Sequence, residues 1–223
     1  MVLELVLLRP GQLPNQPYAV FASEAARLRA VREMTTALKD RRRVLFDLYN
    51  EHDHGDGPLS HAAARTLRDA VKAIDPARLV TISSTAAHVV TDESRVGDEQ
   101  AKNLREEAGS DAGSVGVDVV APHFPRTDDW AAATGPRIKV VREALSRIGR
   151  PLPILLSEER RADEHGSPPA DAYRRAMFAA HDGGAAGWTF HTEAGFELRS
   201  GAFVDSLKPE ERKALSGITV RPR

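Results

Sequence analysis

Six short apolar runs alternate with segments of helical periodicity, and this alternation constrains the fold of the 223-residue chain most strongly. Each run is predicted to be a strand that ends at polar residues. The runs cover residues 2–8, 44–49, 79–83, 117–121, 153–158 and 186–191. Strands that alternate with helices favour βα units and a parallel sheet. The sequence therefore predicts an α/β protein with a single domain, residues 1–223.

The segments between the runs repeat apolar residues every three or four positions, which is typical of helices with one buried face. They predict helices over residues 23–40, 60–74, 98–108, 136–148, 170–182 and 208–215. Ser23 is suited to be a helix N-cap, and Pro76 is expected to end the second helix. We expect Pro136 in the first turn of its helix, where no hydrogen bond needs its missing amide hydrogen.

Composition excludes several classes of protein. The chain has no cysteine, so disulfides, thiolate metal sites and cysteine nucleophiles are excluded. Its formal net charge is −1, so we expect no basic face and no nucleic-acid partner. No apolar run approaches the ~18 residues of a membrane span, and residues 1–10 do not resemble a signal peptide. We expect no membrane association. The chain as it stands predicts a cytoplasmic protein, and a secreted one if an N-terminal segment is missing.

Polar residues gather where the predicted strands end. These strand tips hold Asn50, Glu51, Ser83, Ser84, His123, Glu158 and His191. In an α/β barrel the carboxyl ends of the strands form the face that carries the active site. Glu51 and Glu158 can act as a pair, in which one carboxylic acid protonates a glycosidic oxygen and the other attacks or activates water. The alternative is that each is a solvated residue beyond a strand end, paired with Arg160 or Arg161.

Two strand-end motifs carry a resemblance to a known group of enzymes. Residues 46–51, FDLYNE, are similar to the end of the fourth strand in retaining glycoside hydrolases with (β/α)8 barrels, the cellulase- and mannanase-like enzymes. Residues 153–158, PILLSE, are similar to the end of their seventh strand. Residues 74–80, IDPARLV, and the aromatic Trp188 on the last strand also resemble that clan. The resemblance covers residues 2–200 and implies a TIM-barrel type of fold.

The same resemblance implies a role for each strand-tip residue. Glu51 would be the acid/base with a raised pKa, and Glu158 the ionised nucleophile. Asn50 would hydrogen-bond the sugar 2-hydroxyl. The other substrate-binding residues would be His123, Trp188 and His191. The implied reaction is retaining hydrolysis of the O-glycosidic bonds of a β-linked poly- or oligosaccharide, and it needs no cofactor.

The chain departs from this clan in two ways. If residues 44–49 are the fourth strand, the six predicted units correspond to strands three to eight, so the barrel is incomplete. The open sheet edge would favour a homodimer that covers it. In addition, Glu159 follows Glu158 directly, and a second carboxylate there can raise the pKa of the nucleophile. The alternative is a non-catalytic carbohydrate-binding relative, a degenerate relative or a fragment of a longer enzyme.

The histidine-rich strand tips allow a further interpretation as a metal site, which would make the protein a metal-dependent barrel hydrolase. Its ligands would come from His52, Asp53, His88, His123 and His191. A polar surface turn is the simpler explanation, and we assign no metal ligands. Trp130 can either stack on a sugar or pack in the core, and the sequence does not decide between these roles.

Overall fold

The computed structural model describes residues 2–9, 23–54, 58–85, 98–162, 166–192 and 203–217. Its strands are short and follow the predicted order. They are β1 (Leu3–Val6), β2 (Val44–Asp47), β3 (Val80–Thr81), β4 (Ser83–Thr85), β5 (Ala121–His123), β6 (Leu155–Leu156) and β7 (Gly187–Trp188). The helices are α1 (Glu24–Leu38), α2 (His61–Ile74), α4 (Asp98–Ala108), α5 (Trp130–Arg147), α6 (Ala170–Gly183), α7 (Phe203–Ser206) and α8 (Pro209–Ser216).

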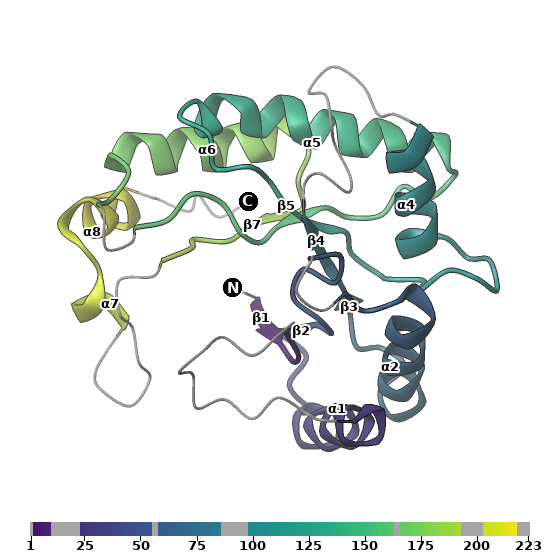
Figure 1. Ribbon diagram of the computed structural model, residues 1–223. Helices are drawn as coiled ribbons and strands as arrows, with labels where there is room; N and C mark the ends of the chain where they lie inside the picture. The colour runs from purple at the N-terminus through teal and green to yellow at the C-terminus, as the bar shows by residue number, and fades with distance from the viewer. Residues whose placement is uncertain are drawn as a thin grey trace.

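The strands form one curved parallel series. β1, β2 and β3 pair in that order, β4 pairs with β5, and β6 pairs with β7, all in parallel. Only Ile82 separates β3 from β4, and a parallel bridge between Val120 and Ile154 connects the runs that lead into β5 and β6. Figure 1 shows α1, α2, α4, α5 and α6 around the outside of these strands. The predicted alternation of strands and helices is confirmed.

The core lies between the strands and the outer helices. α2 turns Ala64, Leu67 and Val71 toward it, the one-sided spacing that the sequence predicts. Phe46 and Leu48, from the run that contains β2, are completely buried in the same cluster. Burying each large apolar side chain contributes ~1.5–3 kcal/mol. The buried interface thus fixes the direction of each strand, and with it the position of each strand tip.

At the N-terminal ends of the strands, a buried arginine bonds to the segment after α1, to the first residue of β2 and to the segment after α2. Arg78, 2% exposed, precedes β3 and donates from Nη1 to the carbonyl oxygens of Arg41 (2.7 Å) and Val44 (2.6 Å). Its Nη2 lies 3.0 Å from Oδ2 of buried Asp75, and Arg42 Nη1 donates to Oδ1 of Asp75 at 2.8 Å. We call Arg42, Asp75 and Arg78 the arginine network. Asp75 and Arg78 both come from residues 74–80, and the network holds the end of α2 against the start of β2.

Several predicted boundaries were wrong. The run at 79–83 is two strands, β3 and β4, and the run at 153–158 contains only the two-residue strand β6. The run at residues 117–121 is largely buried, but the strand itself, β5, is Ala121–His123. Within the run, the Asp118 amide donates to the Val80 carbonyl oxygen at 2.9 Å, and Asp118 Oδ2 accepts from the Val80 amide at 2.9 Å. The helix predicted to begin at Pro136 begins at Trp130, with Pro136 inside it. Here α5 packs closely on α6, where a Cβ added at Gly183 would meet the Gly135 carbonyl oxygen at 2.9 Å.

The first and last strands of the series each have one neighbour among the described residues. β1 pairs with β2 and β7 pairs with β6. Val2, Leu3 and Val6, on or beside β1, are 46–65% exposed. This edge is open within the described part of the chain, and the homodimer that would cover it remains a prediction. Among the described residues, no helix combines the length and the apolar character needed to cross a membrane.

Candidate active site at the strand tips

The loop after β2 carries Glu51 and is fixed to β4 through backbone and hydroxyl groups. The Glu51 amide donates to Ser83 Oγ at 3.0 Å, and the His52 amide donates to the Ser83 carbonyl oxygen at 3.0 Å. Ser83 Oγ in turn donates to Oδ2 of buried Asp47 at 2.6 Å. Glu51 is the only described non-glycine residue with a positive φ, +46°. Such a backbone costs ~1–3 kcal/mol, and these contacts hold it in place.

His123 brings Glu51 and Glu158 together. Its Nδ1 lies 3.1 Å from Glu51 Oε1 and 3.4 Å from Glu158 Oε2. One oxygen of each carboxylate and a His123 nitrogen all lie within 4.8 Å of one another. The other ring nitrogen, Nε2, lies 3.1 Å from Ser157 Oγ, which orients the imidazole. We call Glu51, His123 and Glu158 the carboxylate site. A separation of ~5–5.5 Å between two carboxyl groups is typical of retaining glycosidases.

Two arginines contact the carboxylate of Glu158. Arg161 Nη1 donates to Oε1 at 2.9 Å, and Arg126 donates to the same oxygen. The Glu158 side chain is 19% exposed, so these charges act in a partly desolvated place. The pairing with Arg161 was expected only under the alternative interpretation, whereas Arg160 lies near Asp128 instead, at 3.2 Å. Positive charge therefore surrounds the residue that the sequence assigns as the nucleophile.

The electrostatics of Glu51 differ from what the acid/base role led us to expect. The hydrogen bond with His123 is the largest influence, and together with the charges of His123, His54 and Arg126 it lowers the pKa of Glu51 although burial opposes this. A raised pKa was predicted. The reason for the difference is that the imidazole stabilises the ionised carboxylate directly.

The sequence led us to expect that Glu159 would act on the neighbouring carboxylate of Glu158, but the Glu159 side chain has other partners. Its side chain is buried and turns toward α5, where Oε1 accepts from Thr134 Oγ1 at 2.5 Å. Its Oε2 accepts from the indole Nε1 of Trp188 at 2.7 Å. Burial raises the pKa of Glu159, although these two hydrogen bonds oppose it. Glu159 thus positions Trp188 and connects β7 to the segment that carries Glu158.

The remaining predicted substrate-binding residues lie beside this site or support it. Asn50 is half-buried, and its backbone N–H donates to the Leu8 carbonyl oxygen at 2.9 Å. His191 Nδ1 donates to the Glu159 carbonyl oxygen at 3.2 Å. Burial and the charge of Arg161 lower the pKa of His191 to about 4, so the ring is neutral near pH 7. Trp188 is half-buried and packs edge-on to Phe190, with ring centroids 6.2 Å apart.

Trp130, whose role the sequence left open, is a packing residue. It is 4% exposed at the start of α5, and its ring meets Tyr173 edge-on with centroids 6.1 Å apart. Among the described residues, the ligands suggested for a metal-dependent hydrolase do not converge on one point. His52 faces Glu107, Asp53 accepts from the Thr85 amide at 2.8 Å, and His123 belongs to the carboxylate site. His88 lies outside the described residues.

Sequence reasoning missed Arg126 as a member of the site. It lies in the loop after β5, three residues beyond His123. Its only signal was this position, because loops that follow strand tips line the same face of a barrel. Asp47 was also missed, since it reads as one polar residue within an apolar strand. In the structure it is buried, and burial raises its pKa although the hydrogen bonds from Ser83 oppose this.

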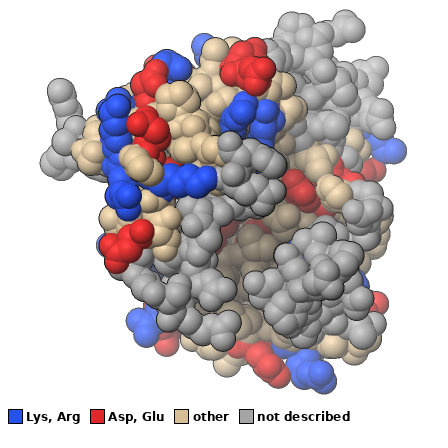
Figure 2. Space-filling model, turned by 60° about the vertical axis from the view of Figure 1, so that its left-hand side comes forward, with Lys and Arg blue, Asp and Glu red and all other residues tan. Residues whose placement is uncertain are grey.

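Figure 2 shows the face seen when the side that carries α7 and α8 is turned forward. The described surface is hollowed near its middle, and uncharged residues make up most of the visible hollow, with acidic groups beside it. Basic and acidic residues are interspersed on the described part of this face. Concave surfaces with few charged groups are typical of small-molecule and sugar sites.

No protein-family model matches the chain, and no curated protein sequence matches it. Solved structures do match. XacCel5A in complex with cellopentaose is 18% identical with a TM-score of 0.56, covering 86% of this chain and 63% of that one. A triple mutant of an endo-β-1,4-glucanase from Xanthomonas axonopodis pv. citri is 16% identical with a TM-score of 0.60, covering 96% and 72%. An exo-β-1,4-mannosidase from Opitutaceae bacterium strain TAV5 is 18% identical with a TM-score of 0.51, covering 76% and 33%.

These similarities establish the fold. The identities are 16–18%, and the chain spans 33–72% of the length of these three structures. The chain has an α/β fold of the (β/α)8 type, and its described strands form an incomplete barrel. The predicted fold class is confirmed.

Proposed function

We propose that the protein hydrolyses the O-glycosidic bonds of a β-linked poly- or oligosaccharide with retention of configuration. One observation carries this proposal: a carboxylate oxygen of Glu51 and one of Glu158 lie within 4.8 Å of each other at the carboxyl ends of parallel strands. That distance suits direct attack by one carboxylate on the sugar, because an inverting pair needs more room for a water molecule. Neither step of this reaction requires a cofactor.

In the proposed first step, a Glu158 oxygen forms a bond to the anomeric carbon while the bond to the leaving oxygen breaks. Glu51 gives its proton to that leaving oxygen. In the second step, Glu51 takes a proton from water, whose oxygen attacks the anomeric carbon and releases Glu158. Asn50, His123, Trp188 and His191 would contact the sugar, and neutral His191 can accept a hydrogen bond from a hydroxyl group through its unprotonated ring nitrogen.

The lowered pKa of Glu51 imposes a condition on this mechanism. Glu51 must carry a proton when the glycosidic bond breaks, yet its hydrogen bond with His123 favours the ionised form. A bound sugar would remove water from the Glu51 side chain, which is 25% exposed, and desolvation raises the pKa of a carboxyl group. We therefore infer that substrate binding supplies the protonated acid.

Separate Glu51→Gln and Glu158→Gln variants test the assignment on aryl glycosides. We expect Glu158→Gln to reduce turnover ~1000-fold or more for every leaving group. Glu51→Gln should slow the first step ~100-fold or more only for poor leaving groups, since activated phenolates leave without a proton. It should also slow the second step for every leaving group, because the attacking water loses its base. The matched control is Glu143→Gln, whose side chain is 59% exposed on α5. Unchanged turnover in both site variants, or an inverted product by NMR, would contradict the proposal.

A non-catalytic carbohydrate-binding protein is the second candidate. The observation that favours it is the pair of arginines on Glu158, which compete with a sugar for the carboxylate. This candidate predicts that cello- or manno-oligosaccharides change the fluorescence of Trp188 without being cleaved. Binding by the unchanged protein without any reducing-end release over days would favour it over the hydrolase.

A further inference from the structure

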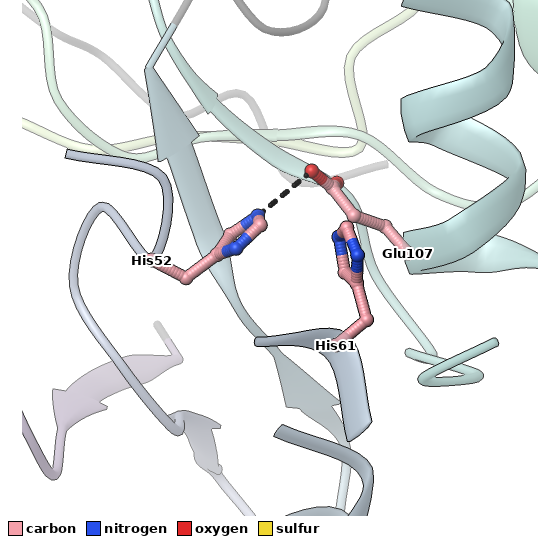
Figure 3. A group of neighbouring side chains, drawn as sticks. All are labelled: His52, His61 and Glu107. Carbon is pink, nitrogen blue, oxygen red and sulfur yellow. Dashed lines mark hydrogen bonds and ion pairs between the residues drawn. The ribbon is translucent and has the colours of Figure 1, made fainter. Parts of the chain in front are cut away.

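A second group of side chains that can bind a metal ion lies on the other side of the loop that carries Glu51. His52 follows Glu51 directly, His61 begins α2, and Glu107 lies in the last turn of α4. One ring nitrogen of each histidine and one carboxylate oxygen lie within 4.8 Å of one another. Figure 3 shows the three side chains pointing toward a common centre from three separate segments. We call these residues the His52 cluster.

The distances between the ligand atoms of the His52 cluster are close to those between ligands of a bound metal ion. His52 Nε2 lies 3.1 Å from Glu107 Oε1, and the two imidazole centroids are 5.0 Å apart. Ligands at ~2.0–2.2 Å from a tetrahedral ion are roughly 3.3–3.6 Å from one another. Small side-chain rotations would therefore bring all three groups to bonding distance without moving a helix.

Each histidine also has an outer partner, as metal-binding histidines almost always do. His61 Nδ1 lies 3.2 Å from Glu106 Oε2, so the ring would present its buried Nε2 to an ion. The His52 ring hydrogen-bonds the backbone of Leu59. Partners of this kind fix the ring orientation and increase the basicity of the ligating nitrogen. These contacts satisfy the ring nitrogens of the two histidines, and they also hold each ring in one orientation.

The local charge also suits a cation. His52 and Glu107 have side chains only 2% and 1% exposed, whereas His61 is 21% exposed, which leaves an approach from solvent. The carboxylates of Glu106 and Glu107 both lie at the cluster. In the carboxylate site, by contrast, Arg126 and Arg161 contact Glu158 and oppose a cation. Of the two groups, the His52 cluster is therefore the better metal site.

We propose that His52, His61 and Glu107 bind one divalent transition-metal ion, with zinc as the best match to two imidazoles and a carboxylate. Water would fill the fourth position. The ion would cross-link the loop after β2 with α2 and α4, and so fix the backbone that presents Glu51. This site is separate from the proposed glycosidase function and does not depend on it.

Zinc binding by the whole chain tests the proposal without any measurement of activity. The protein is treated with EDTA, dialysed and titrated with zinc chloride in a calorimeter, and bound zinc is counted by mass spectrometry. We expect one zinc ion per chain with a dissociation constant of about 1 µM or below, and a rise in Tm of about 5–10 °C at saturation. Absence of stoichiometric zinc uptake by the unchanged protein overturns the proposal.

Three variants locate the ion. His61→Ala, at the most exposed ligand, should fold and weaken zinc binding at least tenfold. His181→Ala is the matched control, because His181 is 68% exposed on α6 and should leave binding unchanged. Glu158→Gln should also bind zinc as the unchanged protein does. Equal binding by His61→Ala, or loss of binding only in Glu158→Gln, would place the ion elsewhere and overturn the proposal.

Discussion

The two ends of the parallel strands both hold acidic and basic side chains in contact, but they are built differently. At the N-terminal ends, Arg78 and Asp75 are 2% and 1% exposed, and the guanidinium of Arg78 donates to backbone carbonyl oxygens. At the C-terminal ends, the side chains of Glu51 and Glu158 are 25% and 19% exposed and converge on His123. In the first arrangement buried charged groups contact one another and the backbone, whereas in the second two partly exposed carboxylates meet at one imidazole.

This difference separates a structural role from a chemical one. A buried charge that donates to backbone carbonyl groups fixes the chain, and removing one partner leaves the others unsatisfied. Two partly buried carboxylates whose oxygens lie within 4.8 Å of each other repel, so this arrangement contributes little to stability. The comparison therefore predicts that substitutions in the arginine network act on unfolding, and that substitutions in the carboxylate site act on titration and turnover.

Replacing Arg78 should produce the largest loss of stability. Arg78→Met keeps the length of the side chain but removes the hydrogen bonds to Arg41 and Val44, and it leaves the buried Asp75 with only the exposed Arg42 as a charged partner. We expect a loss of about 3–5 kcal/mol in the free energy of unfolding, measured by urea titration. Arg32→Met on the exposed face of α1 is the matched control and should change it little. A loss below about 1 kcal/mol for Arg78→Met would remove the distinction between the two ends.

Glu4 should give the next largest effect, and it should depend on pH. Burial and the charge of Asp47 raise the pKa of Glu4 to about 7, and its Oε1 has no hydrogen-bond partner among the described residues. Because the pKa of Glu4 is higher in the folded state than its ordinary value, the contribution of Glu4 to stability is fully present below about pH 4.5. That contribution is lost as the pH rises through about 7.

Glu4→Gln should therefore stabilise the protein by about 1–3 kcal/mol at pH 8, and the gain should shrink as the pH falls toward 5. Urea titrations at several pH values measure this difference. Glu33→Gln, on the exposed face of α1, is the matched control and should follow the unchanged protein. The same pH dependence in Glu4→Gln and the unchanged protein would show that Glu4 is not the group responsible.

His123→Gln should change titration more than stability. Without the imidazole, the pKa of Glu51 should rise, because the hydrogen bond with His123 is the main cause that lowers it. Carbon-13 NMR of the glutamate carboxyl groups can follow this directly, with His181→Gln as the control. We expect the free energy of unfolding to fall by only about 1 kcal/mol. A Glu51 titration that does not move would mean that His123 positions the carboxylates without tuning them.

The sequence predicted the strand tips better than the strand bounds. Glu51, His123, Glu158 and His191 lie at or just beyond the carboxyl ends of strands in one parallel series, so topology predicts that they are near one another. The start of α5 was placed at Pro136 instead of Trp130, since a proline is common in a first turn while its cost inside a helix depends on tertiary packing. That packing, the close contact of Gly135 with Gly183, has no signature in local periodicity.

Side-chain contacts between distant segments were the hardest part to predict. Arg126 reaches Glu158 from a loop 32 residues away, and Glu107 reaches His52 from 55 residues away. Spacing along the chain cannot indicate such pairs, because they depend on how two helices or loops pack. The effect of Glu159 was mispredicted for a related reason: its neighbour in sequence is Glu158, but its partners in space are Thr134 and Trp188.

The smallest expected effect lies within the arginine network itself. Arg42 and Arg78 both contact Asp75, but the Arg42 side chain is 58% exposed whereas that of Arg78 is 1% exposed. An exposed ion pair contributes about 0.2–1 kcal/mol, since water solvates the cation whether or not it is paired. Arg42→Gln should therefore lower the free energy of unfolding by no more than this in urea titrations, with Arg29→Gln on α1 as the control. A loss as large as that of Arg78→Met would mean that contact with Asp75, and not burial, determines how much an arginine contributes to the free energy of unfolding at this end of the strands.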